Sequence, residues 1–299
     1  MQKTIKRLLP ILALLWALPV LAEGEMKPFV LASKHSGDKA MLVEQMKTKL
    51  SKAGFELAGE YSPYPAVSIL IVTNETLKTA AAESEYGAYG AAQRVTITEQ
   101  NGELQVAYTN PVYMAHAYQL SAGLDDVATA LRTTLGEMAQ YGPEAGLTAE
   151  KLRKYHYMFG MPYLDEPDKL AKYKTHAEAV AAVEQGLAAG NSGTSKVYRI
   201  DMANNKTLFG VAMTKGMSSD TYIMHEIDFK PIRSTGHLPY EILVDGNSIY
   251  SLRAEFRIAI NFPDLKMMGS NSFMNIMAAP DAIKTALAHA SGVKPGDNN

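Results

Sequence analysis

Apolar and polar positions along the chain fall into two successive series of strand-like and helix-like segments. Residues 67–72 form a near-continuous apolar run rich in β-branched side chains, which predicts a central strand covered on both faces. Residues 41–53 instead repeat their apolar positions at helical spacing, between a cap at residues 36–38 and Gly54. We therefore expect strands and helices to be interspersed in each series.

Two hairpins are predicted from their turn residues. Residues 93–108 surround Asn101-Gly102, the pair that a type I′ turn prefers because both central residues need positive φ. Residues 196–202 and 207–213 form a second hairpin across Asn204-Asn205. Strands that flank such turns pair with each other, so both halves of the chain should contain antiparallel ladders.

The most patterned stretch is residues 238–268, in which a strand leads into a turn at Asp245-Gly246. We expect the second strand to continue through Arg253 and Arg257, whose spacing of four would place both on one face. Asn261-Phe262-Pro263 should then stop this strand.

The order of strand, turn, strand and stop occurs twice, which predicts a duplicated unit. The two turns are 144 residues apart and Pro111 and Pro263 are 152 apart, so longer hairpin arms are expected in the second copy. The final helices, 124–131 and 279–287, correspond. We predict an α+β protein of two similar domains, each a mixed sheet with helices packed on one face. The predicted domains are residues 28–139 and 155–292, with a first strand at 155–163, a linker at 140–154 and a disordered tail at 293–299.

The N-terminal residues predict export. Lys3, Lys6 and Arg7 precede an apolar run at 8–21, and Ala22 offers a small residue for cleavage. This run is shorter than the ~20 residues that span a bilayer. We predict a signal peptide at 1–22 and no transmembrane segment after cleavage. The expected location is the periplasm, with full secretion as the alternative.

Composition narrows the function classes. The chain has no cysteine, so it has no disulfides and no thiolate metal sites. Removal of the three basic residues of the signal leaves 26 basic against 31 acidic residues, without a basic stripe to neutralise phosphates. Nucleic acid is therefore not an expected partner.

Short motifs resemble one known family. A helix ends in Ala53-Gly54-Phe55, and Leu238-Pro239 opens a later strand. With the hairpins, these features resemble the domain-of-unknown-function family numbered 302, over most of 28–138 and more loosely over 155–290. The resemblance implies a small two-layer α/β fold. It implies no established reaction, so no catalytic residue is carried over.

The candidate binding residues are polar aromatic and ionisable side chains. Tyr offers an apolar body with a polar tip, which suits interfaces, and Tyr86 and Tyr89 lie in a Gly-rich loop. A cleft at the domain junction is the expected location for a small molecule, a lipid or an envelope protein. The candidates are Tyr86, Tyr89, Tyr113, His225, Glu226, His237 and Arg257.

We therefore expect a non-catalytic binding or accessory protein without a cofactor. One alternative is an envelope hydrolase with a His and carboxylate site at the junction, although no Gly-x-Ser-x-Gly elbow is present. Another is a soft-metal protein, such as a copper-binding protein, that uses Met114, His116, Met267 and Met268. Against this last reading, Met is also a common core filler.

Overall fold

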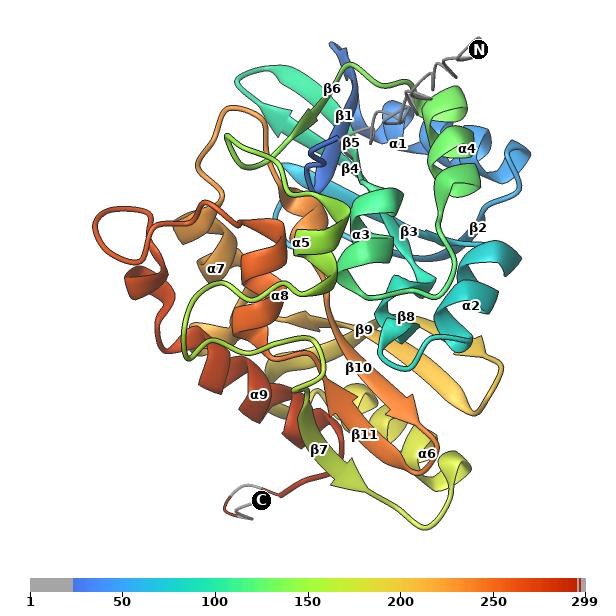
Figure 1. The fold of residues 1–299 in the computed structure, drawn as a ribbon, viewed down its shortest axis with the longest axis vertical. Helices are drawn as coiled ribbons and strands as arrows, with labels where there is room; N and C mark the ends of the chain where they lie inside the picture. Colours follow the sequence, from blue (N-terminus) through green and yellow to red (C-terminus); the bar gives the residue numbers. More distant parts are fainter. Residues whose placement is uncertain (1–23, 295, 297–299) are drawn as a thin grey trace, which may run out of the picture.

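The computed structural model describes residues 24–294 and 296 of this α+β protein (Figure 1). The predicted signal peptide, 1–22, lies outside the described residues. Residues 295 and 297–299 of the predicted tail also lie outside them. Two sheets form the framework, and every strand pair within them is antiparallel. The predicted fold class is confirmed, but the sheets are not mixed, because all neighbouring strands in both sheets run antiparallel.

The first sheet has the strand order β2-β3-β4-β5-β1-β6. Its strands are β1 (Phe29–His35), β2 (Glu56–Tyr61), β3 (Val67–Thr73), β4 (Gln93–Gln100), β5 (Glu103–Thr109) and β6 (Ala139–Tyr141). The helical segments of this half are α1 (Lys39–Lys52), α2 (Glu75–Ala82), the 3₁₀ segment η1 (Gly87–Ala91), α3 (Pro111–Ala117), α4 (Asp125–Leu135) and α5 (Ala149–Arg153). The segment predicted as a linker, 140–154, thus contains the end of β6 and all of α5.

The second sheet has the order β7-β11-β10-β9-β8. Its strands are β7 (Asp168–Lys172), β8 (Thr194–Met202), β9 (Lys206–Met213), β10 (Tyr240–Asp245) and β11 (Ser248–Ser251). The α-helices of this half are α6 (His176–Ala188), α7 (Asp220–Ile227), α8 (Ala254–Asn261) and α9 (Ala279–Ala290). Its 3₁₀ segments are η2 (Asn191–Gly193), η3 (Gly216–Ser218), η4 (Thr235–His237) and η5 (Phe273–Ile276).

The two halves share one topology. From β2 the first sheet reads β2-β3-β4-β5-β1, and from β8 the second reads β8-β9-β10-β11-β7. The β-bulges match as well. The strand register shifts at Ala58 in β2 and at Val197 in the corresponding strand β8. It also shifts at Ala32 in β1 and at Leu170 in the corresponding strand β7. Matched bulges fix the equivalence of positions, because each bulge adds one residue at a defined place.

This register makes Arg94 and Glu241 equivalent. Arg94 of β4 pairs with Ile71, one pair beyond the bulge at Ala58. Glu241 of β10 pairs with Gly210, which lies one pair beyond the bulge at Val197. The same position of the repeated unit therefore holds an arginine in one copy and a glutamate in the other.

The predicted strand through Arg253 and Arg257 is wrong. Arg253 is the N-cap of α8, and Arg257 lies within that helix. The β11 strand ends at Ser251, opposite Asp168, the first residue of its partner β7. The helix instead buries Phe256, Ile258 and Ile260. Asn261-Phe262-Pro263 marks the end of a helix rather than of a strand.

Three further expectations are corrected. Pro111 lies in the first turn of α3, where proline is favoured, whereas Pro263 follows α8, so the two prolines are not equivalent. The hairpin arms of the second copy are shorter, not longer, since β11 has 4 residues and β5 has 7. Residues 155–163 form no strand, and the first strand of this half is β7.

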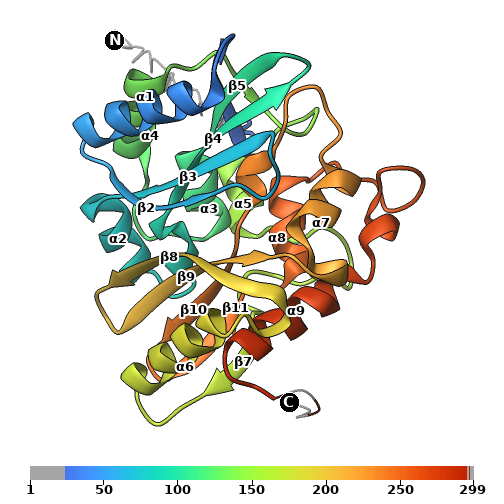
Figure 2. The same cartoon turned by 180° about the vertical axis from the view of Figure 1, so that it is seen from behind.

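Each sheet is covered on one face by helices of its own half and on the other by the opposite half. Helices α1 and α4 pack on the first sheet, and α6 and α9 on the second (Figures 1 and 2). The segment η4 of the second half lies on β3, β4 and β5, while η1 of the first half lies on β9 and β10. This reciprocal exchange of segments joins the two halves into one continuous apolar core.

Candidate functional site

His237 and Arg257 lie in a buried polar cluster where the halves meet. Arg94 forms an ion pair with Glu241, and Arg257 Nη2 lies 3.7 Å from the other oxygen of that carboxylate. Arg257 also donates to the His237 carbonyl at 2.7 Å. These side chains are almost fully buried. The cluster therefore couples β4 of the first half to β10 and α8 of the second.

The electrostatics of this junction cluster favour a structural role. Burial and the positive charge of Arg257 together lower the pKa of Arg94 to about 10. Burial, with the two guanidinium groups, also holds the pKa of His237 well below its usual value, so its ring is neutral. His237 Nε2 lies 2.9 Å from the Tyr240 hydroxyl. Neither His237 nor Arg257 lines any of the four cavities that we describe in the resolved part of the chain.

Tyr113 is likewise part of the junction between halves. Its hydroxyl donates to the Ile260 carbonyl at 2.8 Å, and the side chain is fully buried. This bond links α3 to α8, the helices that follow the hairpin in each copy. The structure thus gives Tyr113 a packing contact and no access to solvent.

His225 and Glu226 lie near the end of α7, on the surface. The His225 side chain is 85% exposed, and its Nδ1 is 3.7 Å from Glu226 Oε1. His225 borders a cavity, but Glu226 does not line it. The geometry does not hold this pair in a fixed hydrogen bond, because 3.7 Å exceeds the usual donor–acceptor distance.

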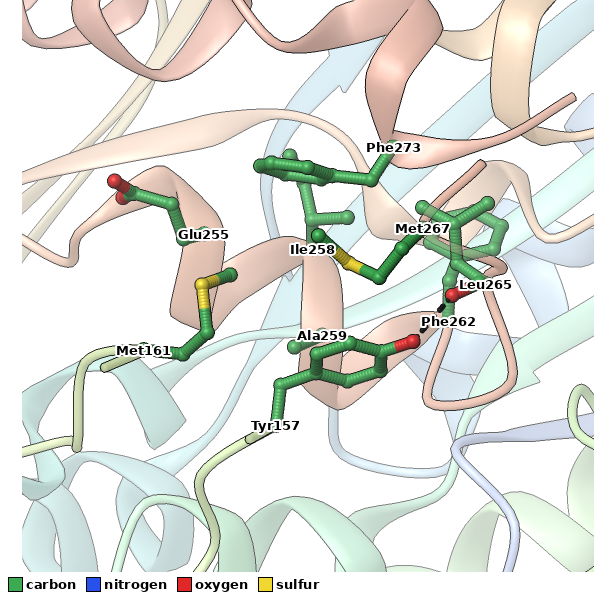
Figure 3. A pocket seen from close by; sticks show the side chains of 9 residues that line it. All are labelled: Tyr157, Met161, Glu255, Ile258, Ala259, Phe262, Leu265, Met267 and Phe273. Atoms are coloured by element: carbon green, nitrogen blue, oxygen red, sulfur yellow. Dashed lines mark hydrogen bonds between the residues drawn. The ribbon is translucent and has the colours of Figure 1, made fainter. Parts of the chain in front are cut away.

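The four candidate metal ligands lie in different surroundings. Met114 is buried in α3, and His116 Nδ1 accepts a hydrogen bond from Arg153 at 3.2 Å. Met268 is exposed, while Met267 lines an apolar pocket beside α8 (Figure 3). Within residues 24–294, no group of three or more His, Asp or Glu side chains is arranged to hold a metal ion.

The apolar pocket in Figure 3 is nearly filled. Side chains from α8 face Tyr157, Met267 and Phe273, and the Tyr157 hydroxyl donates to the Leu265 carbonyl at 2.6 Å. The free volume is about 10 Å³, roughly the space of one water molecule. A small organic ligand would not fit without rearrangement of these side chains.

Tyr86 and Tyr89 do lie together, in a cavity of about 430 Å³ between the halves, which we call the acidic cleft. The loop around η1 contributes one wall, residues 164–167 a second, and the strands β10 and β11 a third. The lining residues are Glu85, Tyr86, Tyr89, Leu164, Asp165, Pro167, Leu243, Asp245 and Tyr250.

The polar groups of the acidic cleft are incompletely compensated. Burial raises the pKa of Asp245, although the positive charge of Lys206 acts in the opposite direction. The Lys206 ammonium itself is bound to the Ser84 carbonyl at 2.7 Å. The negative charge of Glu85 raises the pKa of Tyr86. The buried Tyr89 hydroxyl has no hydrogen-bond partner among the described residues.

The sequence pattern found part of this cleft and missed the rest. Tyr86 and Tyr89 were predicted as binding residues because burial in the core is less certain for an aromatic residue in a Gly-rich loop than for one in a strand. Glu85, Asp165 and Asp245 come from segments far apart in the chain, and each has an ordinary local role in a loop or turn. No local pattern brings these three carboxylates together, because their proximity depends on how the halves pack.

Comparison of the chain with protein-family models, curated proteins and solved structures gave no significant match. The resemblance to the family numbered 302 thus remains a prediction. Among the described helices, none is both long enough and apolar enough to cross a bilayer.

Proposed function

We propose that this protein is an exported, non-catalytic binding protein that takes a small organic cation into the acidic cleft. The observation that carries the proposal is the lining of that cleft. It includes the carboxylates Glu85, Asp165 and Asp245, and no Lys, Arg or His of the described chain is among the residues that line it. Lys206, the cross-strand neighbour of Asp245, is bound to the Ser84 carbonyl and does not line the cleft, so the lining favours a ligand that brings its own positive charge.

The aromatic residues of the cleft suit the same class of ligand. Tyr86, Tyr89 and Tyr250 line the same cleft as the carboxylates, and aromatic ring faces attract cations within about 6 Å of the ring centre. The unpartnered Tyr89 hydroxyl supplies a further polar group on the buried side. A volume of about 430 Å³ lies in the range of small-molecule sites.

A titration with two amines tests this proposal. The probes are putrescine and choline, and the protein is isolated from the periplasmic fraction, where we expect its chain to begin at Glu23. Isothermal titration calorimetry should detect binding of at least one probe. Replacing Asp245→Asn should weaken it by roughly tenfold or more, because a charge-assisted hydrogen bond contributes about 1.5–3 kcal/mol.

The matched control is Glu99→Gln. This change also removes one carboxylate, but Glu99 is exposed at the end of β4 and lies outside the acidic cleft. It should leave the affinity within about twofold of the wild type. Failure of both amines to bind, or equal binding by wild type and Asp245→Asn, would exclude the acidic cleft as a cation site.

A further inference from the structure

Two further cavities lie in another part of the junction between the halves, away from the acidic cleft. They have volumes of about 320 and 510 Å³ and share Asp228, Phe229 and Asn271. Asp228 directly follows α7, as Glu83 follows α2 in the first copy. The larger cavity and the acidic cleft thus involve corresponding loops of the repeat, each of which faces the sheet of the opposite half. The smaller cavity adjoins the larger one and is closed by Gly142 and by the segment that follows α8.

Asp228 presents an unsatisfied oxygen in this second region. Its Oδ1 accepts the Ser234 backbone N–H at 2.9 Å, while its Oδ2 is buried and has no partner among residues 24–294. The nearby cations are bound to other groups. Arg233 donates to the main-chain carbonyl of Asp228, and Lys230 Nζ binds Gly142 O at 2.7 Å and Asp264 Oδ2 at 2.6 Å.

Asn261 presents a second unsatisfied oxygen to the smaller cavity. Its Nδ2 donates to the Arg257 carbonyl at 2.8 Å, which sets the orientation of the amide and leaves Oδ1 as an acceptor. This oxygen is buried and has no partner among the described residues. Asp228 and Asn261 both line the 320 Å³ cavity. Since unpaired buried acceptors are costly, the arrangement favours a molecule that supplies hydrogen-bond donors.

The remaining lining indicates that these donors are uncharged. The carboxylates Asp228 and Asp264 are balanced by the ammonium groups of Lys230 and Lys266. The acidic cleft, in contrast, has three carboxylates and no cation on its lining in the described chain. Phe229 and Phe262 add apolar surface to the smaller cavity. Balanced charge, free acceptors and aromatic rings together suit a neutral molecule with several hydroxyl groups.

We propose that the 320 Å³ cavity binds a neutral, hydroxyl-rich ligand, of the saccharide or polyol class, whose hydroxyls donate to Asp228 Oδ2 and Asn261 Oδ1. Burial raises the pKa of Asp228 to about 7. Donors from the ligand would favour the charged carboxylate and so oppose this effect. The site shares no lining residue with the acidic cleft, and so does not rest on cation binding there.

Saturation-transfer NMR on the whole protein tests this site. The probes are a mixture of glycerol, D-ribose, D-glucose, D-galactose, N-acetyl-D-glucosamine and sucrose. We expect transfer to at least one of them. Asp228→Asn should weaken its binding at least tenfold, because the new amide can keep the Ser234 contact only by presenting a donor where Oδ2 now accepts.

Two further variants complete the experiment. Asn261→Leu removes the second acceptor and should also weaken binding, with thermal unfolding used to confirm that each variant is folded. Asp245→Asn alters the acidic cleft and should bind the same probe as tightly as the wild type. The proposal is overturned by a lack of transfer to every probe, or by equal transfer in wild type and a folded Asp228→Asn protein. It is also overturned if calcium or putrescine binds and Asp228→Asn abolishes that binding.

Discussion

At the scale of single residues, Glu241 connects the two halves electrostatically. It accepts a hydrogen bond from Tyr198 at 3.2 Å in addition to its ion pair with Arg94. Two guanidinium groups, Arg94 and Arg257, share this one carboxylate in a buried setting. Because a buried charge must be compensated locally, the stability of the junction depends on Glu241 more than on an average surface acid.

Replacing Glu241→Gln should therefore destabilise the protein by about 3–5 kcal/mol, the cost usually seen when one partner of a buried ion pair is removed. Urea unfolding followed by circular dichroism measures this change. Glu99→Gln, which removes an exposed carboxylate from the neighbouring first sheet, should shift the unfolding free energy by no more than about 0.5 kcal/mol. Equal midpoints for the two variants would mean that Glu241 does not stabilise the junction.

At the scale of elements, the two halves touch through equivalent edge strands. β2 and β8 lie beside each other without forming a strand pair (Figure 2). Gly59 lies just after the bulge of β2, and an added Cβ there would come within 2.5 Å of Val197 O and 2.8 Å of Tyr198 Cβ. Both of these atoms belong to the bulge region of β8. The approach of the strands thus requires a residue without a side chain.

Gly59→Ala should destabilise the protein by about 1–3 kcal/mol, since the main chain of β8 would have to move. Thermal and urea unfolding would report the loss. Gly123→Ala is the matched control, because its Cβ would meet only the end of the Asp125 side chain, which can rotate away. If both variants were equally stable, the contact between β2 and β8 would be looser than the structure indicates.

The elements that the sequence predicted correctly are those whose pattern is set locally. The apolar run of β3, the periodicity of α1 and the turn at Asn101-Gly102 each determine one structure without reference to distant residues. β7 was missed because Leu170 is its one fully buried residue and three of its five residues are charged, as an edge strand permits. α8 was read as a strand because no local signal shows that β11 stops at Ser251, opposite the first residue of its distant partner β7.

The candidate sites show the same contrast between features that are set locally and features that depend on distant residues. His237 and Arg257 were predicted as binding residues from their chemistry, yet packing encloses both in the junction cluster. Asp228 and Asp245 were missed as site residues, although they line cavities between the halves. Their role depends on which loop of one copy faces which strand of the other. Sequence periodicity contains no information on that arrangement.

At the scale of the whole molecule, neither half covers both faces of its own sheet. Thr98 of β4 hydrogen-bonds through its hydroxyl to Thr235 of η4 at 2.8 Å, so the first sheet is completed by the second half. The second sheet receives η1 of the first half in return. Separation of the halves would expose a large apolar face on each, together with the charges of the junction cluster.

Residues 24–154 and 155–294 produced as separate chains should each lack a cooperative unfolding transition, because each would lose the segment that covers its sheet. Mixing the two chains should restore the transition, with a midpoint that rises with concentration. Differential scanning calorimetry measures both outcomes. A sharp, concentration-independent transition in either isolated half would show that it is an autonomous domain.

The equivalence of Arg94 and Glu241 has a consequence for assembly from identical subunits. A symmetric dimer of either copy would place the same residue on both sides of the axis, either two arginines or two glutamates, and like charges would then face each other in a dry interface. Joining both copies in one chain removes that restriction. Opposite charges can occupy one structural position, and the cavities of the two halves can carry different side chains, with three carboxylates in the acidic cleft and both carboxylates and ammonium groups in the 320 Å³ cavity.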